Sequence, residues 1–164
     1  MSFITSPSSL LLRAGTSARR VAFLAPLLAR VTVGVAFAES GWGKLHNLDK
    51  VAAYFTELGI PAPAFQATFV SWVELICGSL VLLGLATRLA AVPLIATMVV
   101  ALITAKASDI AGFSDLIGTI EFCYAVLLAW LVLAGAGTAS LDHLIARRAT
   151  ALAAERTGLP AALV

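Results

Sequence analysis

Four long apolar segments dominate the sequence and leave it few possible folds. They cover residues 21–43, 65–87, 89–106 and 116–137. At about 20 residues each, they can cross the ~30 Å hydrocarbon core of a bilayer as helices. The 164 residues are 60% apolar and only 12% charged, whereas an ordinary soluble domain carries about 25% charged residues. This balance excludes a soluble globule and a disordered chain, and we predict an all-α, polytopic membrane four-helix bundle.

The same segments divide the chain into three parts. We expect residues 1–20 to form a loosely ordered cytoplasmic extension, residues 21–138 the transmembrane domain, and residues 139–164 a cytoplasmic amphipathic segment. Basic residues near the span ends set the orientation, because cytoplasmic loops are enriched in Lys and Arg. Seven lie on one side and three on the other: Arg13, Arg19, Arg20, Arg88, Arg147, Arg148 and Arg156 against Lys44, Lys50 and Lys106. Both termini are therefore predicted to be cytoplasmic.

Two surface helices are predicted beside the spans. Residues 48–58 carry apolar side chains at helical spacing, so this segment either lies on the outer membrane face, the favoured interpretation, or covers the mouth of the bundle. After the fourth span, Ser140 can cap a helix. Its Arg147 and Arg148 are expected to meet anionic lipid headgroups.

Four ionisable residues interrupt the apolar segments: Arg30, Glu39, Glu74 and Glu121. An ionisable side chain at mid-bilayer costs at least ~2.5–3.5 kcal/mol, so each is a candidate functional residue. At ~1.5 Å of rise per residue, the three glutamates fall in the outer half of the bilayer. Arg30 falls below them.

Helix rotation divides these residues further. At ~100° per residue, Arg30 and Lys44 share one face of the first span and Glu39 points the opposite way. We therefore expect an outward polar pocket containing Arg30, Glu74, Glu121 and Lys44, with Glu74 as the acid nearest to Arg30.

Three interpretations of these charges stay open. Buried Arg–Glu pairs can simply fix helix register. The pocket can instead bind a proton, a quinone headgroup or a small substrate. Glu39 and the outer lysines, Lys106 included, can recognise another protein chain.

Several chemistries lack their residues in this chain. The net charge of +2 is too small to indicate a nucleic-acid partner, and no basic-aromatic tract occurs. His46 and His143 are predicted on opposite sides of the membrane, so neither a bis-histidine haem site nor a zinc site is expected. No metal site or covalently bound cofactor is predicted.

A series of short motifs resembles a known family. Their residues are Arg30-x-x-x-Gly34, Gly41-Trp42-Gly43-Lys44, Glu74-x-x-x-Gly78, Leu83-Gly84-Leu85-Ala86-Thr87-Arg88, and Gly135-Ala136-Gly137 followed by Ser140-Leu141-Asp142. Their order and spacing resemble the DoxX family of small four-helix membrane proteins, related to the DoxD-type subunit of archaeal thiosulfate:quinone oxidoreductase. The resemblance covers about Leu27 to Asp142.

The resemblance implies a membrane subunit of a redox or respiratory assembly in a prokaryotic plasma membrane. A quinone or a thiol-type substrate would then occupy the outward pocket. The chain is too small to hold a flavin or haem domain, so we expect a protein partner that carries a redox cofactor, or a homo-oligomer. A small carrier or proton or solute pathway is one alternative function. A non-catalytic scaffold that stabilises a larger complex is another.

Overall fold

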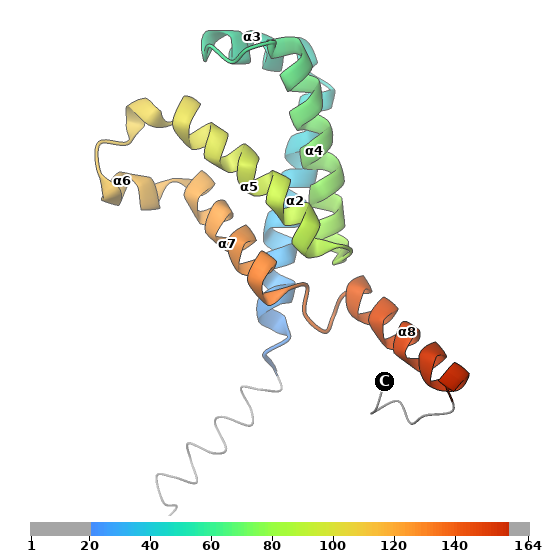
Figure 1. Ribbon diagram of the computed structural model, residues 1–164. Coiled ribbons are helices and arrows are strands. Elements are labelled where there is room, and N and C mark those ends of the chain that lie inside the picture. The colour runs from blue at the N-terminus through green and yellow to red at the C-terminus, as the bar shows by residue number, and fades with distance from the viewer. Residues whose placement is uncertain (1–20, 158–164) are drawn as a thin grey trace, which may run out of the picture.

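The described part of the chain, residues 21–157 of the computed structural model, is built from helices without strands (Figure 1). Side chains are described as far as residue 154. The helices are α2 (Leu24–Leu45), α3 (Leu48–Glu57), α4 (Pro63–Leu83), α5 (Thr87–Thr104), the short 3-10 helix η1 (Ala107–Asp109), α6 (Phe113–Gly118), α7 (Ile120–Ala134) and α8 (Leu141–Thr157). The all-α prediction is confirmed, and the predicted extension of residues 1–20 lies outside the described residues.

Three of these helices, α2, α4 and α5, are long and apolar enough to cross a membrane. The predicted second span continues to residue 87, but α4 ends at Leu83 because Gly84 adopts a left-handed conformation with φ of 71°. Such a residue commonly ends a helix.

The predicted fourth span, residues 116–137, corresponds to a shorter apolar helix. Thr119 is extended and accepts a hydrogen bond from the Phe122 N–H, so α7 starts only at Ile120, and Gly135 at φ 82° follows its end. Its 15 residues rise about 22 Å, less than a typical ~30 Å core. The count of four spans and the cytoplasmic termini stay predictions.

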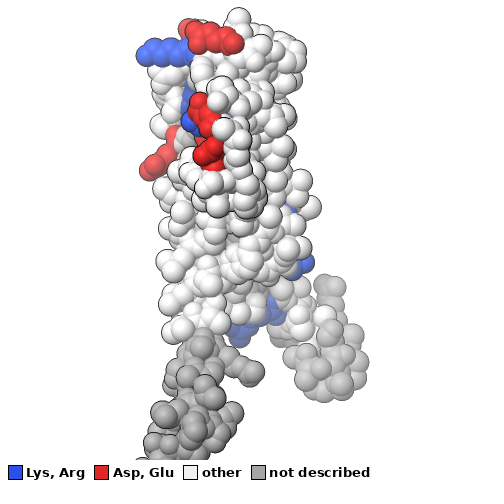
Figure 2. All heavy atoms as spheres, turned by 90° about the vertical axis from the view of Figure 1, so that its left-hand side faces the viewer, with Lys and Arg blue, Asp and Glu red and all other residues white. Residues whose placement is uncertain are grey.

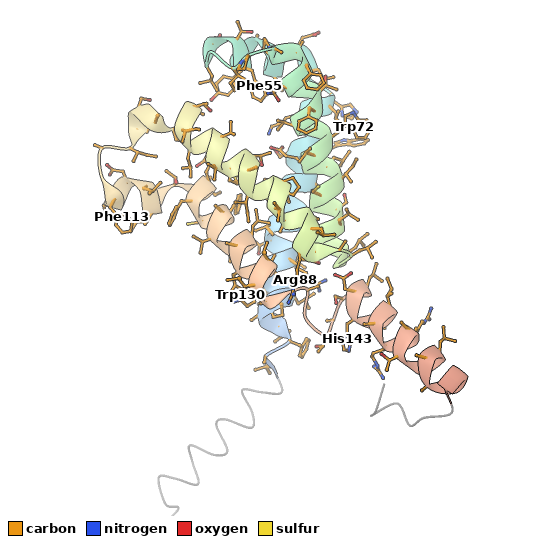
Figure 3. All side chains as sticks on the ribbon, viewed as in Figure 1. Phe55, Trp72, Arg88, Phe113, Trp130 and His143 are labelled. Carbon is orange, nitrogen blue, oxygen red and sulfur yellow. The ribbon has the colours of Figure 1, made fainter. Side chains whose placement is uncertain are left out.

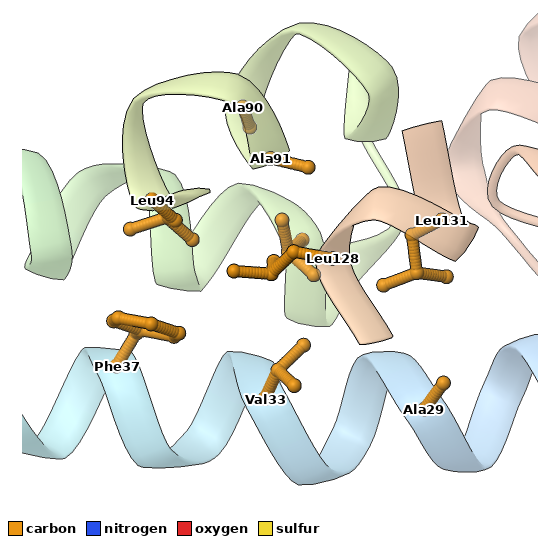
Figure 4. Close-up of a cluster of buried hydrophobic side chains, with 9 residues drawn as sticks. Ala29, Val33, Phe37, Ala90, Ala91, Leu94, Leu128 and Leu131 are labelled. Carbon is orange, nitrogen blue, oxygen red and sulfur yellow. The ribbon is translucent and has the colours of Figure 1, made fainter. Parts of the chain in front are cut away.

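The apolar helices pack as two pairs, α2 with α4 and α5 with α7. The pairs meet in a buried core made of Ala29, Val33, Phe37, Val81, Ala90, Ala91, Leu94, Leu128 and Leu131 (Figure 4). These residues come from α2, the end of α4, the start of α5 and the end of α7, so the pairs are joined at the end of the bundle nearest α8. Toward α3 they diverge (Figure 1).

Glycines set the register between α2 and α4. A Cβ at Gly34 would lie 2.8 Å from the Leu82 backbone, and one at Gly78 would lie 2.7 Å from Ala38 N. Small residues at such positions let membrane helices approach closely. A Cβ at Gly41 would likewise collide with Ser71 O at 2.7 Å, so any side chain at these positions would push the two helices apart.

The helix α3 crosses the end of the bundle where the pairs diverge (Figure 1). It packs against α4, and its Val51, Tyr54 and Phe55 line the space between the pairs. Of the two predicted placements, the structure therefore shows the cover over the bundle mouth.

Charged side chains are unevenly distributed over the face drawn in Figure 2. Acidic and basic side chains lie together toward the α3 end, whereas the charged side chains near the opposite end of this face are basic. The helix α8 leaves the bundle at that opposite end (Figure 1). As predicted, Ser140 caps it, because the Ser140 Oγ accepts the His143 N–H at 3.2 Å.

Candidate functional site

Glu74 is a buried carboxylate that accepts three hydrogen bonds. It lies on α4 with only 2% of its surface exposed. Lys44 Nζ donates to Glu74 Oε1 at 2.5 Å and to Oε2 at 2.6 Å, and Ser40 Oγ donates to Oε2 at 2.8 Å. Ser40 and Lys44 are one helical turn apart on α2, so a single face of that helix satisfies the carboxylate.

The prediction that Glu74 is the acid nearest to Arg30 is wrong. That prediction placed Gly43 and Phe65 at the same height, as if the two spans ended level. The glycine contacts instead shift α4 by about two turns, or roughly 11 Å, toward α3. Glu74 therefore lies level with the segment from Ser40 to Lys44.

The Lys44–Glu74 pair forms part of the wall of a cavity of about 790 Å³ between the two helix pairs. Helices α2, α3, α4, α5 and α7 all contribute side chains. Most are apolar, among them Phe55, which lies on the side of α3 that faces the bundle (Figure 3). The polar and charged ones are Ser40, Lys44, Lys50, Tyr54, Gln66, Glu74, Thr97, Thr104, Glu121 and Tyr124. The cavity therefore has mainly apolar walls that are interrupted by polar and charged side chains, among them the Lys44–Glu74 pair.

Glu121 lines the same cavity from the first turn of α7. Its Oε2 is buried and has no hydrogen-bond partner within residues 21–157. A buried carboxylate oxygen without a donor is costly, so this oxygen is available to a ligand. The structure thus brings together three of the four predicted pocket residues, Glu74, Glu121 and Lys44.

Among the cavity residues that sequence reasoning missed, two lie beside predicted pocket residues. Ser40 precedes Lys44 by one turn, and Tyr124 follows Glu121 by three residues, with its ring 5.8 Å from that of Phe37. Both share a helix face with a predicted pocket residue, and that spacing is the signal that could have identified them.

The fourth predicted pocket residue, Arg30, lies at the other end of the bundle. It is 1% exposed, its Nη2 donates to Ala139 O at 2.5 Å, and its guanidinium packs where a Cβ of Gly84 would be. Its Nε and Nη1 have no partner among the described residues. Arg30 thus holds the loop before α8 against the turn that follows α4.

Asp142 strengthens the same junction. Its N–H donates to Gly84 O at 2.9 Å. Its carboxylate accepts the Ala86 N–H at 2.8 Å and the Thr87 N–H at 3.2 Å, which satisfies amide groups at the start of α5. This arrangement fastens α8 to the bundle.

The residues predicted to meet partners or lipid are not among those that line the cavity. Glu39 is exposed on α2, on the side opposite the core residues. Lys106 is 3.5 Å from Asp109 in the loop after α5. Arg147 and Arg148 are exposed on α8. Their roles in partner or lipid contacts stay predictions.

Comparison with known proteins gives one family match. The DoxX family model matches residues 25–107, which include Arg30, Lys44 and Glu74. The chain is 38% identical over 136 residues to "Uncharacterized membrane protein Rv3486" of Mycobacterium tuberculosis, covering 76% of this chain and 83% of the relative.

It is also 35% identical over 112 residues to "Putative oxidoreductase CatD" of Bacillus subtilis, covering 68% of this chain and 78% of the relative. No solved structure matches the chain significantly.

Proposed function

The chain belongs to the DoxX family of membrane proteins, and from this premise we propose that it is the membrane subunit of a redox or respiratory assembly. In this proposal the cavity between the helix pairs binds a quinone or a thiol-type substrate. The name of the Bacillus subtilis relative, an oxidoreductase, supports a redox role.

The observation that carries the proposal is the Lys44–Glu74 pair in the wall of the cavity. The carboxylate of Glu74 is buried, and a charge taken out of water persists only when its ion pair and its further hydrogen bonds offset the loss of solvation. Here Ser40 supplies the further bond. The ammonium and the carboxylate then offer a donor and an acceptor to one polar headgroup, while the apolar walls bury its ring or chain.

The shape of the cavity supports a lipophilic substrate. The pairs α2–α4 and α5–α7 diverge below α3 (Figure 1), and residues of both pairs line the space. In the proposed orientation, with both termini cytoplasmic, this cavity lies in the outer half of a plasma membrane. A quinone would reach it through the bilayer.

Electrons would be exchanged with a partner protein that carries a redox cofactor. Glu39, exposed on the side of α2 away from the core, and Lys106, at the outer end of α5, are the proposed contacts to that partner or to a second copy.

Equilibrium binding of a short-chain quinone to the purified protein in nanodiscs tests the proposal. We expect Glu74→Gln to weaken binding about tenfold, because a charge-assisted hydrogen bond is lost. Glu39 lies on the side of α2 that faces away from the core. The matched variant Glu39→Gln should therefore bind the quinone like the unchanged protein. Equal affinity of all three proteins, or no quinone and no thiol-type ligand bound by any, would contradict the proposal.

Two carboxylates in one cavity, Glu74 and Glu121, favour a second candidate function, a proton or solute pathway. Glu74→Gln should then abolish flux into proteoliposomes, and unchanged flux would exclude this function. The non-catalytic scaffold is the third proposal; it requires the charged residues to contact partner helices.

A further inference from the structure

A second, smaller pocket lies at the α8 end of the bundle, far from the Lys44–Glu74 pair. It has a volume of about 450 Å³, and Arg88, Asp142 and His143 are its charged or ionisable residues. Its walls come from the start of α5, the loop after α7 and the first residues of α8. We propose that this pocket, here named the Arg88 pocket, binds the phosphate group of an anionic phospholipid.

The guanidinium of Arg88 is held ready for such a ligand. Arg88 Nη2 donates to Leu133 O at 3.2 Å. Gly135 lets the guanidinium lie close to the loop, because a Cβ there would be 3.3 Å from Arg88 Nε and 3.4 Å from Nη2. Arg88 is nevertheless exposed, so some of its N–H groups can bind a phosphate. A planar guanidinium commonly donates two parallel hydrogen bonds to a phosphate.

The one acid in the pocket does not cancel this charge. Both carboxylate oxygens of Asp142 accept backbone N–H groups at the start of α5, those of Ala86 and Thr87. The positive end of that helix therefore offsets the carboxylate. Arg88 is left as the charged donor, and His143, which also lines the pocket, can add an N–H from its ring. Figure 3 shows both residues at the end of the bundle nearest α8.

The surroundings favour a lipid over a free phosphate ion. Leu89 and Leu133 flank Arg88 and are 77% and 79% exposed. Leu89 lies near the start of α5 and Leu133 near the end of α7. In a helix that spans a bilayer, such end positions lie at the boundary between the hydrocarbon core and the lipid headgroups. A phospholipid would place its phosphate on Arg88 and its acyl chains along these leucines.

Native mass spectrometry of the protein in detergent, with phosphatidylglycerol or phosphatidylcholine added, tests the proposal. The unchanged protein should retain phosphatidylglycerol about fivefold more than phosphatidylcholine, and Arg88→Gln should lose this preference because the charge-assisted bonds are gone. The matched variant Lys106→Gln removes a positive charge after the far end of α5, outside the pocket, and should keep the preference.

Three outcomes would overturn the proposal. Arg88→Gln can leave the preference unreduced, which would exclude Arg88 as the phosphate ligand. Lys106→Gln can abolish the preference, which would assign binding to the overall positive charge of the protein. Inorganic phosphate at millimolar concentration can displace the lipid, which would assign the pocket to a free ion.

A second measurement needs no variant. Phosphatidylglycerol should raise the melting temperature of the unchanged protein more than phosphatidylcholine or inorganic phosphate does, and equal shifts would contradict the proposal.

Discussion

Lys44 Nζ lies 2.5 and 2.6 Å from the two carboxylate oxygens of Glu74, a residue 30 positions away on the neighbouring helix. The two partners are not equivalent. Glu74 is 2% exposed, whereas the Lys44 side chain is 30% exposed. The lysine can turn toward solvent if its partner is removed. The buried carboxylate cannot reach solvent if Lys44 is removed.

This asymmetry predicts the order of stability of three variants. Lys44→Met should lower the free energy of unfolding by about 1–3 kcal/mol, because it leaves a buried carboxylate without its main donor. Glu74→Gln should cost less, and the double variant should be more stable than Lys44→Met alone. Thermal unfolding in detergent measures all three, and a larger loss for Glu74→Gln would contradict the assignment.

Two glycines of α2 offer a matched test of the α2–α4 register. A Cβ at Gly41 would meet Ser71 O at 2.7 Å, whereas one at Gly43 would meet nothing within 4 Å. Gly41→Ala should therefore destabilise the protein by about 1–3 kcal/mol through overpacking. Gly43→Ala should be neutral or stabilising by up to about 1 kcal/mol, because alanine is the better helix former. Equal melting temperatures of the two variants would refute the register.

The junction between α5 and α8 predicts a local effect. Asp142→Ala removes the acceptor for the Ala86 and Thr87 N–H groups and should cost about 1 kcal/mol, as loss of a helix cap does. Hydrogen exchange at these two amides should accelerate. Asp109→Ala, which removes an exposed pair with Lys106, should leave both amides unchanged. Unaltered exchange in Asp142→Ala would show that the cap does not hold the junction.

The helices α2, α4 and α5 could be predicted from the sequence. A long apolar segment enters the lipid, and there it must be helical because unpaired backbone groups are costly. The sequence also identified Glu74, Glu121 and Lys44, since an ionisable residue in such a segment is conspicuous. The partner of Glu74 could not be obtained in this way. Depth counted along each helix assumes level ends, whereas the offset between α2 and α4 is set by contacts of Gly34, Gly41 and Gly78.

Arg30 shows the same limit from the other side. Its burial was predictable from its place in an apolar segment, but its partner is a carbonyl, Ala139 O, 109 positions away. Every residue has a backbone carbonyl, so the amino-acid sequence does not show which carbonyl will accept a hydrogen bond from Arg30. The short fourth helix is a comparable case, because the Thr119 cap that delays α7 lies inside an otherwise apolar segment.

The cavity beside the Lys44–Glu74 pair is proposed to bind a quinone or thiol-type substrate. Photolabelling with an azido-quinone, followed by peptide mapping, tests this claim most directly. Labels should fall on cavity residues such as Phe55, Val73 and Met98, excess unlabelled quinone should suppress them, and Glu74→Gln should reduce them. Labelling concentrated on Trp72 and Ile76, which are exposed on α4 away from the cavity, and unaffected by competitor or by Glu74→Gln, would contradict the claim.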